Sequence, residues 1–343
     1  MSSHQQSADP GDPSARVAAL RRAATAALRA PSILNTQPWQ WRIHGEAAEL
    51  RADRDRQLPV IDPEGRLLTL SCGTALDHLR TALAAEGYQT SVVRTPDQAD
   101  CDLLARVEIT GHGEPHAADM RHYQSMLIRH TDRRPFLPTP MLAATVEALR
   151  GAVERRSAHL HVIRLDQLAE FTVIADRAAA AETADPAYRA ELSAWTHRAE
   201  GSDEGVPAST AVPEVRRRVP LRDFMLDGTG GLPAGTGDDT GATYGIIFTD
   251  ADDPDAWLRA GEAFSGLLLT AVEHDVSVSP MSDLIEVASA RESLRRLIAR
   301  IGEPMLVLRM GLAEPIAGIP ETPRRSAEEV ITGDLDGGDE GTS

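Results

Sequence analysis

Arg129 to Arg134 bring three guanidinium groups, one hydroxyl and one imidazole into six consecutive residues, and Pro135 and Phe136 end the stretch. Clusters of arginine are often solvated basic turns, and that interpretation stays open for this stretch taken alone. The alternative is an anion site, because guanidinium forks and backbone N–H groups hold phosphate. The formal net charge is −17, so the cluster is not part of a general positive surface. We treat it as a candidate phosphate site.

The composition of the chain excludes several other kinds of site. With 343 residues, of which 42% are hydrophobic, the chain can bury a large core. The acidic excess argues against nucleic acid or an anionic membrane as partner. Every Lys or Arg position is arginine. The chain therefore has no lysine for a pyridoxal Schiff base, a phosphate-loop lysine or a lysine general base.

The cysteines and the N-terminus predict a soluble cytoplasmic protein. Cys72 and Cys101 have no metal-type spacing and make no disulfide framework, which fits a reducing compartment. Residues 1–13 read as a disordered polar leader without the apolar core of a signal peptide. No apolar run approaches the roughly 18 residues of a membrane span. His112, His116 and His122 are too loosely spaced for a metal site, so no metal is expected.

A second polar stretch, residues 31–39, leads into an alternating segment that predicts a strand. It contains Ser32, Asn35, Thr36 and Gln37. Amide side chains carry both donors and acceptors, so they can contact the edge of a heterocycle with alternating C=O and N–H groups. An amide-rich turn that enters a strand is the simpler alternative, and the stretch alone does not decide between them.

Hydrophobic periodicity predicts the elements that must position these two stretches. The expected helices are 14–28, 67–86, 117–128, 141–155, 167–199 with a break near 185–186, 256–274 and 284–301; the expected strands are 39–44, 49–53, 90–94, 103–110, 159–165, 244–249, 276–279 and 305–310. Residues 200–241 are rich in Gly, Pro, Ser and Asp and too long for an ordinary connection, which predicts a lid. Small residues such as Gly73, Ala75, Gly261, Ala263 and Gly266 predict that helices approach closely.

Three motifs together resemble the FMN-dependent nitroreductase family. Residues 129–133 are similar to its phosphate motif, Arg-(His/Arg)-Ser-x-(Lys/Arg), and residues 31–39 to its loop, Pro-Ser-Ser-x-Asn-x-Gln-Pro-Trp. Residues 261–274, the turn 279–282 and residues 302–310 resemble its flavin-stacking region. Residues 323–330 resemble its closing arm.

The order of the motifs differs from that of an ordinary nitroreductase, in which the phosphate motif comes first and the flavin lies between two subunits. Here the amide loop precedes the phosphate motif, and each half of the chain keeps what the other lacks. This order resembles the Acg family, which are fused single-chain relatives of nitroreductases. The resemblance implies an α+β nitroreductase-like fold of two pseudo-repeated halves around a central mixed sheet, with a lid. It divides the chain into a leader (1–13), a first half (14–116), a second half (117–332) with its lid at about 200–241, and an acidic tail (333–343).

The resemblance also implies the roles of individual residues. The phosphate and ribityl chain of FMN would be bound at the octet and the arm, the isoalloxazine ring would meet the amide loop, and the turn would lie on one ring face with a backbone N–H near flavin N5. The implied cofactor-binding residues are Arg129, His130, Thr131, Arg133, Pro31, Ser32, Asn35, Gln37, Pro280, Met281, Ser282, Arg324 and Arg325. No catalytic side chain is expected, because the redox chemistry is that of the flavin.

The implied activity is that of an FMN-dependent oxidoreductase. NAD(P)H would reduce the flavin, and an electron-poor acceptor such as a nitro compound or a quinone would take the electrons in a ping-pong cycle. The alternative from another class is a storage protein that sequesters FMN under a closed lid. The fused chain would be a monomer that mimics a dimer, or would form a further homodimer.

Overall fold

A computed structural model describes residues 12–196, 198–199, 201–213, 215, 217–224, 231–315 and 321–333. All but two residues of the predicted leader, and all but one of the predicted acidic tail, lie outside these ranges. The helices are α1 (Pro13–Ala27), α2 (Arg66–Ala85), α3 (Ala117–Ile128), α4 (Ala143–Glu154), α5 (Leu168–Ala184), α6 (Pro186–Thr196), α7 (Pro254–Glu273), α8 (Asp283–Glu286), α9 (Ala288–Leu297) and α10 (Ala327–Val330). The strands are β1 (Trp39–His44), β2 (Ala47–Ala52), β3 (Tyr88–Arg94), β4 (Leu103–His112), β5 (His159–Val162), β6 (Thr243–Thr249), β7 (Ser277–Met281), β8 (Glu303–Gly311) and β9 (Ile331–Gly333), and short three-ten turns lie at Ile33–Asn35, Arg54–Arg56 and Ala208–Thr210.

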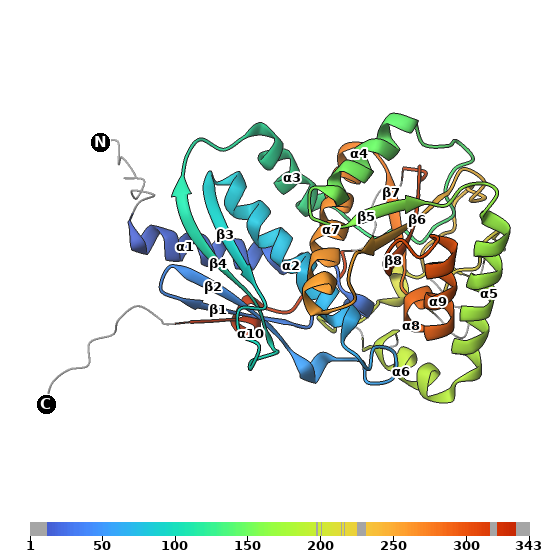
Figure 1. Ribbon diagram of the computed structural model, residues 1–343, viewed down its shortest axis with the longest axis horizontal. Coiled ribbons are helices and arrows are strands. Elements are labelled where there is room, and N and C mark those ends of the chain that lie inside the picture. Colours follow the sequence, from blue (N-terminus) through green and yellow to red (C-terminus); the bar gives the residue numbers. More distant parts are fainter. Residues whose placement is uncertain are drawn as a thin grey trace, which may run out of the picture.

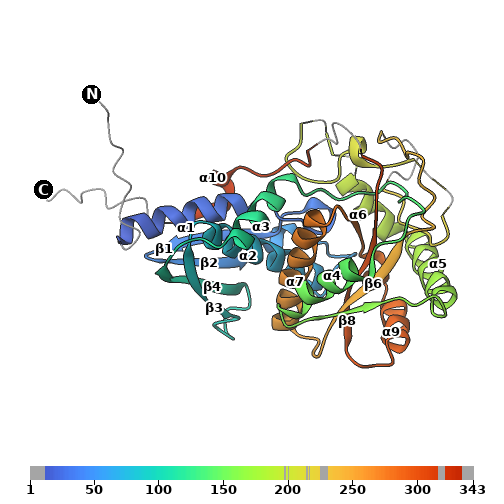
Figure 2. The same ribbon diagram turned by 90° about the horizontal axis from the view of Figure 1, so that it is seen from above.

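These elements form an α+β fold with two sheets, as Figures 1 and 2 show. The N-terminal sheet has the order β3-β4-β2-β1-β9, and the C-terminal sheet has the order β5-β6-β8-β7. All strand pairs are antiparallel except β1 with β9, which run parallel. The expectation of one central mixed sheet is wrong. A helix pair, α2 and α7, lies between the two sheets instead.

The α2–α7 pair is tight because small residues meet where the helices cross. These two helices make the most extensive helix–helix contact of the described chain. A Cβ atom added at Gly73 would collide with the carbonyl oxygen of Leu258, and one at Gly261 would collide with that of Leu70. The predicted close approach at Gly73 and Gly261 is therefore confirmed. Gly266 does not contribute to this close approach, because a Cβ there would meet the guanidinium of Arg156 rather than a helix.

The C-terminal sheet is covered by helices on both faces, which explains the continuous burial of its central strands. Along β8, Leu306 and Leu308 pack in one apolar cluster with α4 and α7, whereas Val307 packs in another with α5 and α9. Successive side chains of a strand point to opposite faces, so both faces of β8 are apolar. The N-terminal sheet packs on α1 and α2 in a separate cluster that contains Trp39 and Trp41.

Most expected elements are present, and the differences have local causes. The strand 39–44 and the helix 117–128 have the predicted bounds. Helix α1 begins one residue before Ser14, because the Asp12 side chain caps it by accepting a hydrogen bond from Ser14 N–H at 3.2 Å. Pro280 and Met281 lie in strand β7 rather than in a turn. Proline is tolerated there because β7 is an edge strand. The predicted helix 284–301 breaks at Val287, whose backbone is extended.

The C-terminal arm returns to the first sheet. Strand β9, residues Ile331–Gly333, pairs with β1, although the sequence division assigns most of it to the second half. Within the predicted lid, the described residues between 201 and 241 contain no helix or strand beyond the turn Ala208–Thr210. Among the helices described, none has the length and apolar character needed to cross a bilayer.

Candidate functional site

A cavity lies beside the α2–α7 pair, and residues from distant parts of the chain line it. Its volume is about 890 Å³, including the part that opens to solvent. We call it the main cavity. It is lined by Pro31, Ser32, Ile33, Leu34, Asn35, Leu67, Leu70, Ser71, Thr74, Arg129, Thr131, Arg133, Val206, Pro207, Thr210, Arg222, Phe224, Phe264, Pro280, Ser282, Leu306, Thr322 and Arg324. The amide loop, the arginine octet, the predicted lid, β7 and the arm thus meet at one site.

The octet reaches the cavity as an extended segment whose side chains alternate. Arg129, Thr131 and Arg133 line the cavity. Asp132 and Arg134 point the other way and are buried against each other, with Arg134 Nη2 2.7 Å from Asp132 Oδ2. In an extended backbone, residues two apart share a face, so the spacing of the three cavity residues follows from the conformation.

A buried arginine holds the octet against the C-terminal sheet. Arg309 of β8 donates to the carbonyl oxygens of Asp132 at 3.1 Å and Arg134 at 2.9 Å, and its guanidinium lies 3.7 Å from the ring centre of Phe136. Asp239 accepts hydrogen bonds from Phe136 N–H and from Arg309. The octet is therefore attached by its backbone, which leaves the cavity-facing side chains available.

Three arginines of the cavity lack a counter-charge. In the described part of the chain, no carboxylate lies within ion-pair distance of Arg129, Arg133 or Arg324, and the Nε of each has no acceptor. Burial lowers the pKa of Arg129 and of Arg133 to about 10. Burial, and then the charge of Arg129, lower the pKa of Arg324 to about 9. Each guanidinium is thus disfavoured as a cation, so an anion bound between them would be stabilised.

The amide loop is held in place by hydroxyl groups of α2. Thr74 donates its hydroxyl hydrogen toward the carbonyl oxygens of Pro31 at 2.6 Å and Ser71 at 2.7 Å, and Ser71 Oγ accepts from Ile33 N–H at 3.0 Å. The loop is strained, because Leu34, Asn35 and Gln37 have φ values of 44°, 54° and 49°. Backbone strain of this kind persists where surrounding contacts enforce it, and it is common at binding sites.

Asn35 joins three segments at the cavity wall. Its amide nitrogen donates to the carbonyl oxygens of Gly205 and Pro323, both at 3.1 Å, and its Oδ1 accepts from Arg324 at 3.2 Å. The loop, the predicted lid and the arm therefore meet at this one side chain. Asn35 and Arg324 both line the cavity.

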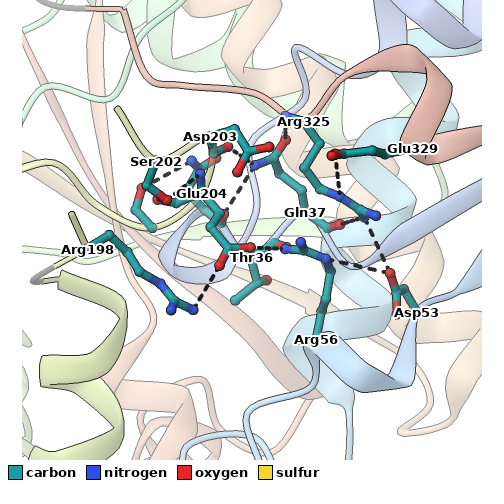
Figure 3. Close-up of polar contacts among 12 residues, drawn as sticks. Thr36, Gln37, Asp53, Arg56, Arg198, Ser202, Asp203, Glu204, Arg325 and Glu329 are labelled. Carbon is teal, nitrogen blue, oxygen red and sulfur yellow. Dashed lines mark hydrogen bonds and ion pairs between the residues drawn. The ribbon is translucent and has the colours of Figure 1, made fainter. Parts of the chain in front are cut away.

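Gln37 and Arg325 lie in a different cluster, outside the main cavity, that Figure 3 shows. Gln37 Nε2 donates to the carbonyl oxygen of Asp203 at 2.8 Å, and its Oε1 accepts from Arg325 N–H at 2.9 Å. The Arg325 side chain lies 3.3 Å from Asp53, with which it forms an ion pair. Neighbouring pairs, including Arg56 with Glu204 at 2.5 Å, complete the cluster. These side chains connect the amide loop to the arm and to the start of the predicted lid.

Strand β7 and the predicted lid form another part of the cavity wall. Pro280 and Ser282 line the main cavity there with Phe224. Met281 faces a second cavity of about 670 Å³, the side cavity, which lies between β7 and the described residues 212–213, 215, 217 and 221–224. Phe224 lines both cavities, and the guanidinium of Arg133 lies 4.4 Å from the centre of its ring. His130 lies in neither, because it faces an outer groove at the ends of α1 and α3.

Arg222 also lines this part of the wall and, unlike the trio, lies beside two carboxylates. Its Nη2 lies 2.5 Å from Glu286 and 3.0 Å from Glu182. Burial alone would lower the pKa of Arg222, but Glu286 and Glu182 raise it well above the usual value. Tyr188 Oη contacts both carboxylates, at 2.5 Å from Glu182 and 2.6 Å from Glu286.

Sequence reasoning missed part of the cavity wall. Leu67, Ser71 and Thr74 lie on one face of α2, and Phe264 of α7 lies across from them. The signal in the sequence was the pair of hydroxyl residues Ser71 and Thr74, at helical spacing within the uncharged stretch 67–76. Among the described residues, no group of three or more His, Cys, Asp or Glu side chains could hold a metal ion.

Comparison with known proteins gives the family. The chain is 36% identical over 319 residues to "Putative NAD(P)H nitroreductase Rv3131" of Mycobacterium tuberculosis, which covers 91% of this chain and 90% of that protein. It is 31% identical over 315 residues to "Putative NAD(P)H nitroreductase acg" of the same organism, covering 91% and 95%. The chain belongs to the Acg family of nitroreductase-related proteins.

More distant likenesses exist among solved structures. An Anabaena variabilis protein described as a nitroreductase gives a TM-score of 0.46 at 10% identity and covers 87% of this chain and 73% of that one. The FMN-dependent nitroreductase NfnB of Mycobacterium smegmatis, solved with NADPH, gives 0.41 at 13% identity and covers 62% and 97%. No protein-family model matches the chain.

Proposed function

We propose that the chain is a flavoprotein that binds one FMN in the main cavity and acts as an NAD(P)H-dependent oxidoreductase. The observation that carries the proposal is the trio Arg129, Arg133 and Arg324, which is half-buried in the cavity wall and has no carboxylate within ion-pair distance among the described residues. Two relatives carry the name "Putative NAD(P)H nitroreductase", which supports the same class of function.

The cavity has the chemistry that FMN requires. A phosphate dianion would offset the charge of the trio, and arginine forks are well suited to bind phosphate. Thr131 adds a hydroxyl beside the trio. Apolar walls from Leu67, Leu70 and Phe264 suit a planar ring system. Ser32 and Asn35 supply polar groups for the ring edge.

Each residue then has a defined task. The trio and Thr131 would hold the phosphate and ribityl chain, and Ser32 with Asn35 would orient the ring. Pro280 would lie against one ring face, and the backbone N–H of Ser282 would approach N5. Gln37 and Arg325 would act indirectly, by holding the loop and the arm in position, and Met281 would support Pro280 from the side cavity. The bound flavin would supply the hydride-transfer chemistry, from NAD(P)H to an electron-poor acceptor such as a nitro compound or a quinone.

The test is anaerobic reduction of the purified protein loaded with FMN. NADH and NADPH are added separately, and bleaching of the flavin absorbance is followed, before a nitroaromatic compound or a quinone is added to reoxidise it. Bleaching by one nucleotide and recovery by an acceptor would support the proposal. A protein that binds no FMN would contradict both the cofactor and the activity.

A second candidate function, FMN sequestration, is favoured by the position of Phe224. This residue of the predicted lid lines the main cavity and contacts Arg133, and Val206, Pro207 and Thr210 line the cavity as well. If these residues cover the ring, nicotinamide has no access to it. Stable FMN binding without bleaching by either nucleotide would favour storage. A Phe224→Ala variant that gains reduction would identify the cover.

A further inference from the structure

The outer groove adjoins the arginine trio from outside. Arg129, Thr322 and Arg324 line both the main cavity and this groove, so they form the partition between the two. The groove has a volume of about 1530 Å³, including the part open to solvent. An anion held by Arg129 and Arg324 in the main cavity would therefore lie next to the outer groove, on the other side of this partition.

The charge of the groove is opposite to that of the protein. Besides Arg129 and Arg324, its lining includes Arg29, His130 and Arg325, against the single carboxylate of Glu321. In the described ranges, Arg29 and His130 have no carboxylate within ion-pair distance. The chain as a whole has 52 acidic residues against 35 basic ones, so such a cluster attracts anions locally.

One side of the groove is apolar. The last residues of α3 form a shelf, in which Ile128 is 67% exposed and Leu127 is 39% exposed, and the buried Leu28, just after α1, and Met126 also line the groove. Guanidinium and imidazole planes can stack on a purine, and an aliphatic shelf can support its other face. The groove thus combines cations for phosphate with surfaces for a base.

We propose that the outer groove binds a nucleoside phosphate, namely the adenylate half of a dinucleotide, next to the flavin phosphate. The partition formed by Arg129 and Arg324 would let these two guanidinium groups contact phosphates on both sides. The adenylate has two sources: the flavin itself when it is FAD, whose second phosphate continues from the first, or NAD(P)H bound beside FMN. The inference rests on the proposed flavin site, and the experiment separates the two.

The experiment uses the full chain and two groove variants. Arg29→Ala removes a cation, and its backbone carbonyl, which accepts from Arg129 at 3.4 Å and Arg324 at 3.2 Å, is unchanged. Ile128→Glu adds a negative charge on the shelf. Each has a matched control: Arg121→Ala, an exposed arginine of α3 outside the groove, and Leu165→Glu, which is 79% exposed and remote from it.

Affinities are measured by titration calorimetry for FMN and FAD with flavin-free protein, and for AMP and inorganic phosphate with FMN-loaded protein. If the adenylate belongs to the flavin, FAD binds about tenfold more tightly than FMN, and the groove variants remove this advantage while the controls keep it. If it belongs to NAD(P)H, FAD has no advantage, but AMP binds the FMN-loaded protein and the groove variants weaken it about tenfold.

Normal FMN binding without either effect would overturn the groove while leaving the flavin site intact. AMP binding that inorganic phosphate matches, or that the controls weaken equally, would overturn it as well, since it would reflect general attraction of anions. Loss of FMN binding in the unmodified protein would instead refute the flavin site.

Discussion

Arg133 and Arg222 both line the main cavity beside Phe224, yet their surroundings are opposite. Their guanidinium carbons are 4.4 Å and 5.9 Å from the centre of its ring. Burial lowers the pKa of Arg133 to about 10, with the charge of Asp132 opposing the change. The carboxylates of Glu286 and Glu182 raise the pKa of Arg222 against the effect of burial. Among the described residues, Arg133 therefore has no carboxylate within ion-pair distance, whereas Arg222 has two.

The group around Arg222 also holds one proton more than it would if both Glu182 and Glu286 were ionised. The hydroxyl of Tyr188 has one hydrogen, but its oxygen makes short contacts with both Glu182 and Glu286. The second contact requires a proton on one of the two carboxyl groups. Burial and then the neighbouring Glu286 raise the pKa of Glu182, in agreement with this count. The surroundings of Arg133 thus favour an external anion, whereas Arg222 already has carboxyl partners within the chain.

The most direct test of this difference is to replace each arginine in turn. Arg222→Met should lower the free energy of unfolding by about 3–5 kcal/mol, because it leaves the buried Glu182 and Glu286 without their cation. Arg133→Met should change it by less than about 1 kcal/mol, because no buried anion loses a partner. Urea denaturation of the flavin-free proteins measures both. Equal losses of unfolding free energy in the two variants would show that the surroundings of Arg133 and Arg222 do not differ in this respect.

The second prediction concerns the affinity for the cofactor. Arg129→Ala should weaken FMN binding roughly 10- to 100-fold, the effect of one charge-assisted contact to phosphate, and should yield a largely colourless protein. Riboflavin has no phosphate, so its affinity should stay the same in the variant. Fluorescence titration with the two flavins provides the control within one protein. Full retention of flavin by Arg129→Ala would refute the phosphate assignment.

The third prediction concerns pH, and it follows from carboxyl groups near Arg222 and its carboxyl partners. Burial raises the pKa of Asp62 from 3.8 to about 6, and that of Asp283 to about 7. The folded state therefore binds more protons than the unfolded state between about pH 4 and about pH 7, and stability falls as pH rises through this range. Asp62 should contribute about 1–2 kcal/mol to the loss from about pH 5 to about pH 8.

Thermal denaturation of Asp62→Asn across this range is the measurement, and the variant should show a weaker dependence on pH. Asp166→Asn is the control, because Asp166 is exposed and its hydrogen bond from Arg164 lowers its pKa. An unchanged slope in Asp62→Asn would mean that this carboxyl group is ionised throughout.

The smallest effect is expected at a pair of adjacent residues. Arg324 faces the cavity without a carboxylate partner in the described chain, whereas Arg325 is paired with Asp53. Arg324→Ala should weaken FMN binding about tenfold, and Arg325→Ala less than about threefold. Titration of both variants with FMN compares them directly. A reversed order would assign the phosphate contact to Arg325.

The sequence was informative where local pattern determines position. The Gly73 and Gly261 contact follows from small residues on two long helices, and the strand at 39–44 follows from strict alternation. The octet could also have been resolved further, because alternation along an extended segment separates Arg129, Thr131 and Arg133 from their neighbours.

The rest could not be predicted because it depends on partners distant in the chain. Gln37 belongs to the amide loop by sequence, but Asp203 and Arg325 occupy its side chain. Nothing in the local sequence distinguishes Arg325 from Arg324 until Asp53 lies beside one of them. The single central sheet was wrong for the same reason, since the placement of two sheets depends on how α2 and α7 cross.

Strand β9 has a consequence for how the protein is made. It is the final described strand, and it pairs with β1, which is synthesised well before it. At synthesis rates of about 5–20 residues per second, β1 is without its neighbouring strand β9 for on the order of tens of seconds. An edge strand in that state can pair with another nascent chain. Truncation before residue 331 should therefore promote aggregation during expression, and chaperones that bind nascent chains should matter most for this end of the protein.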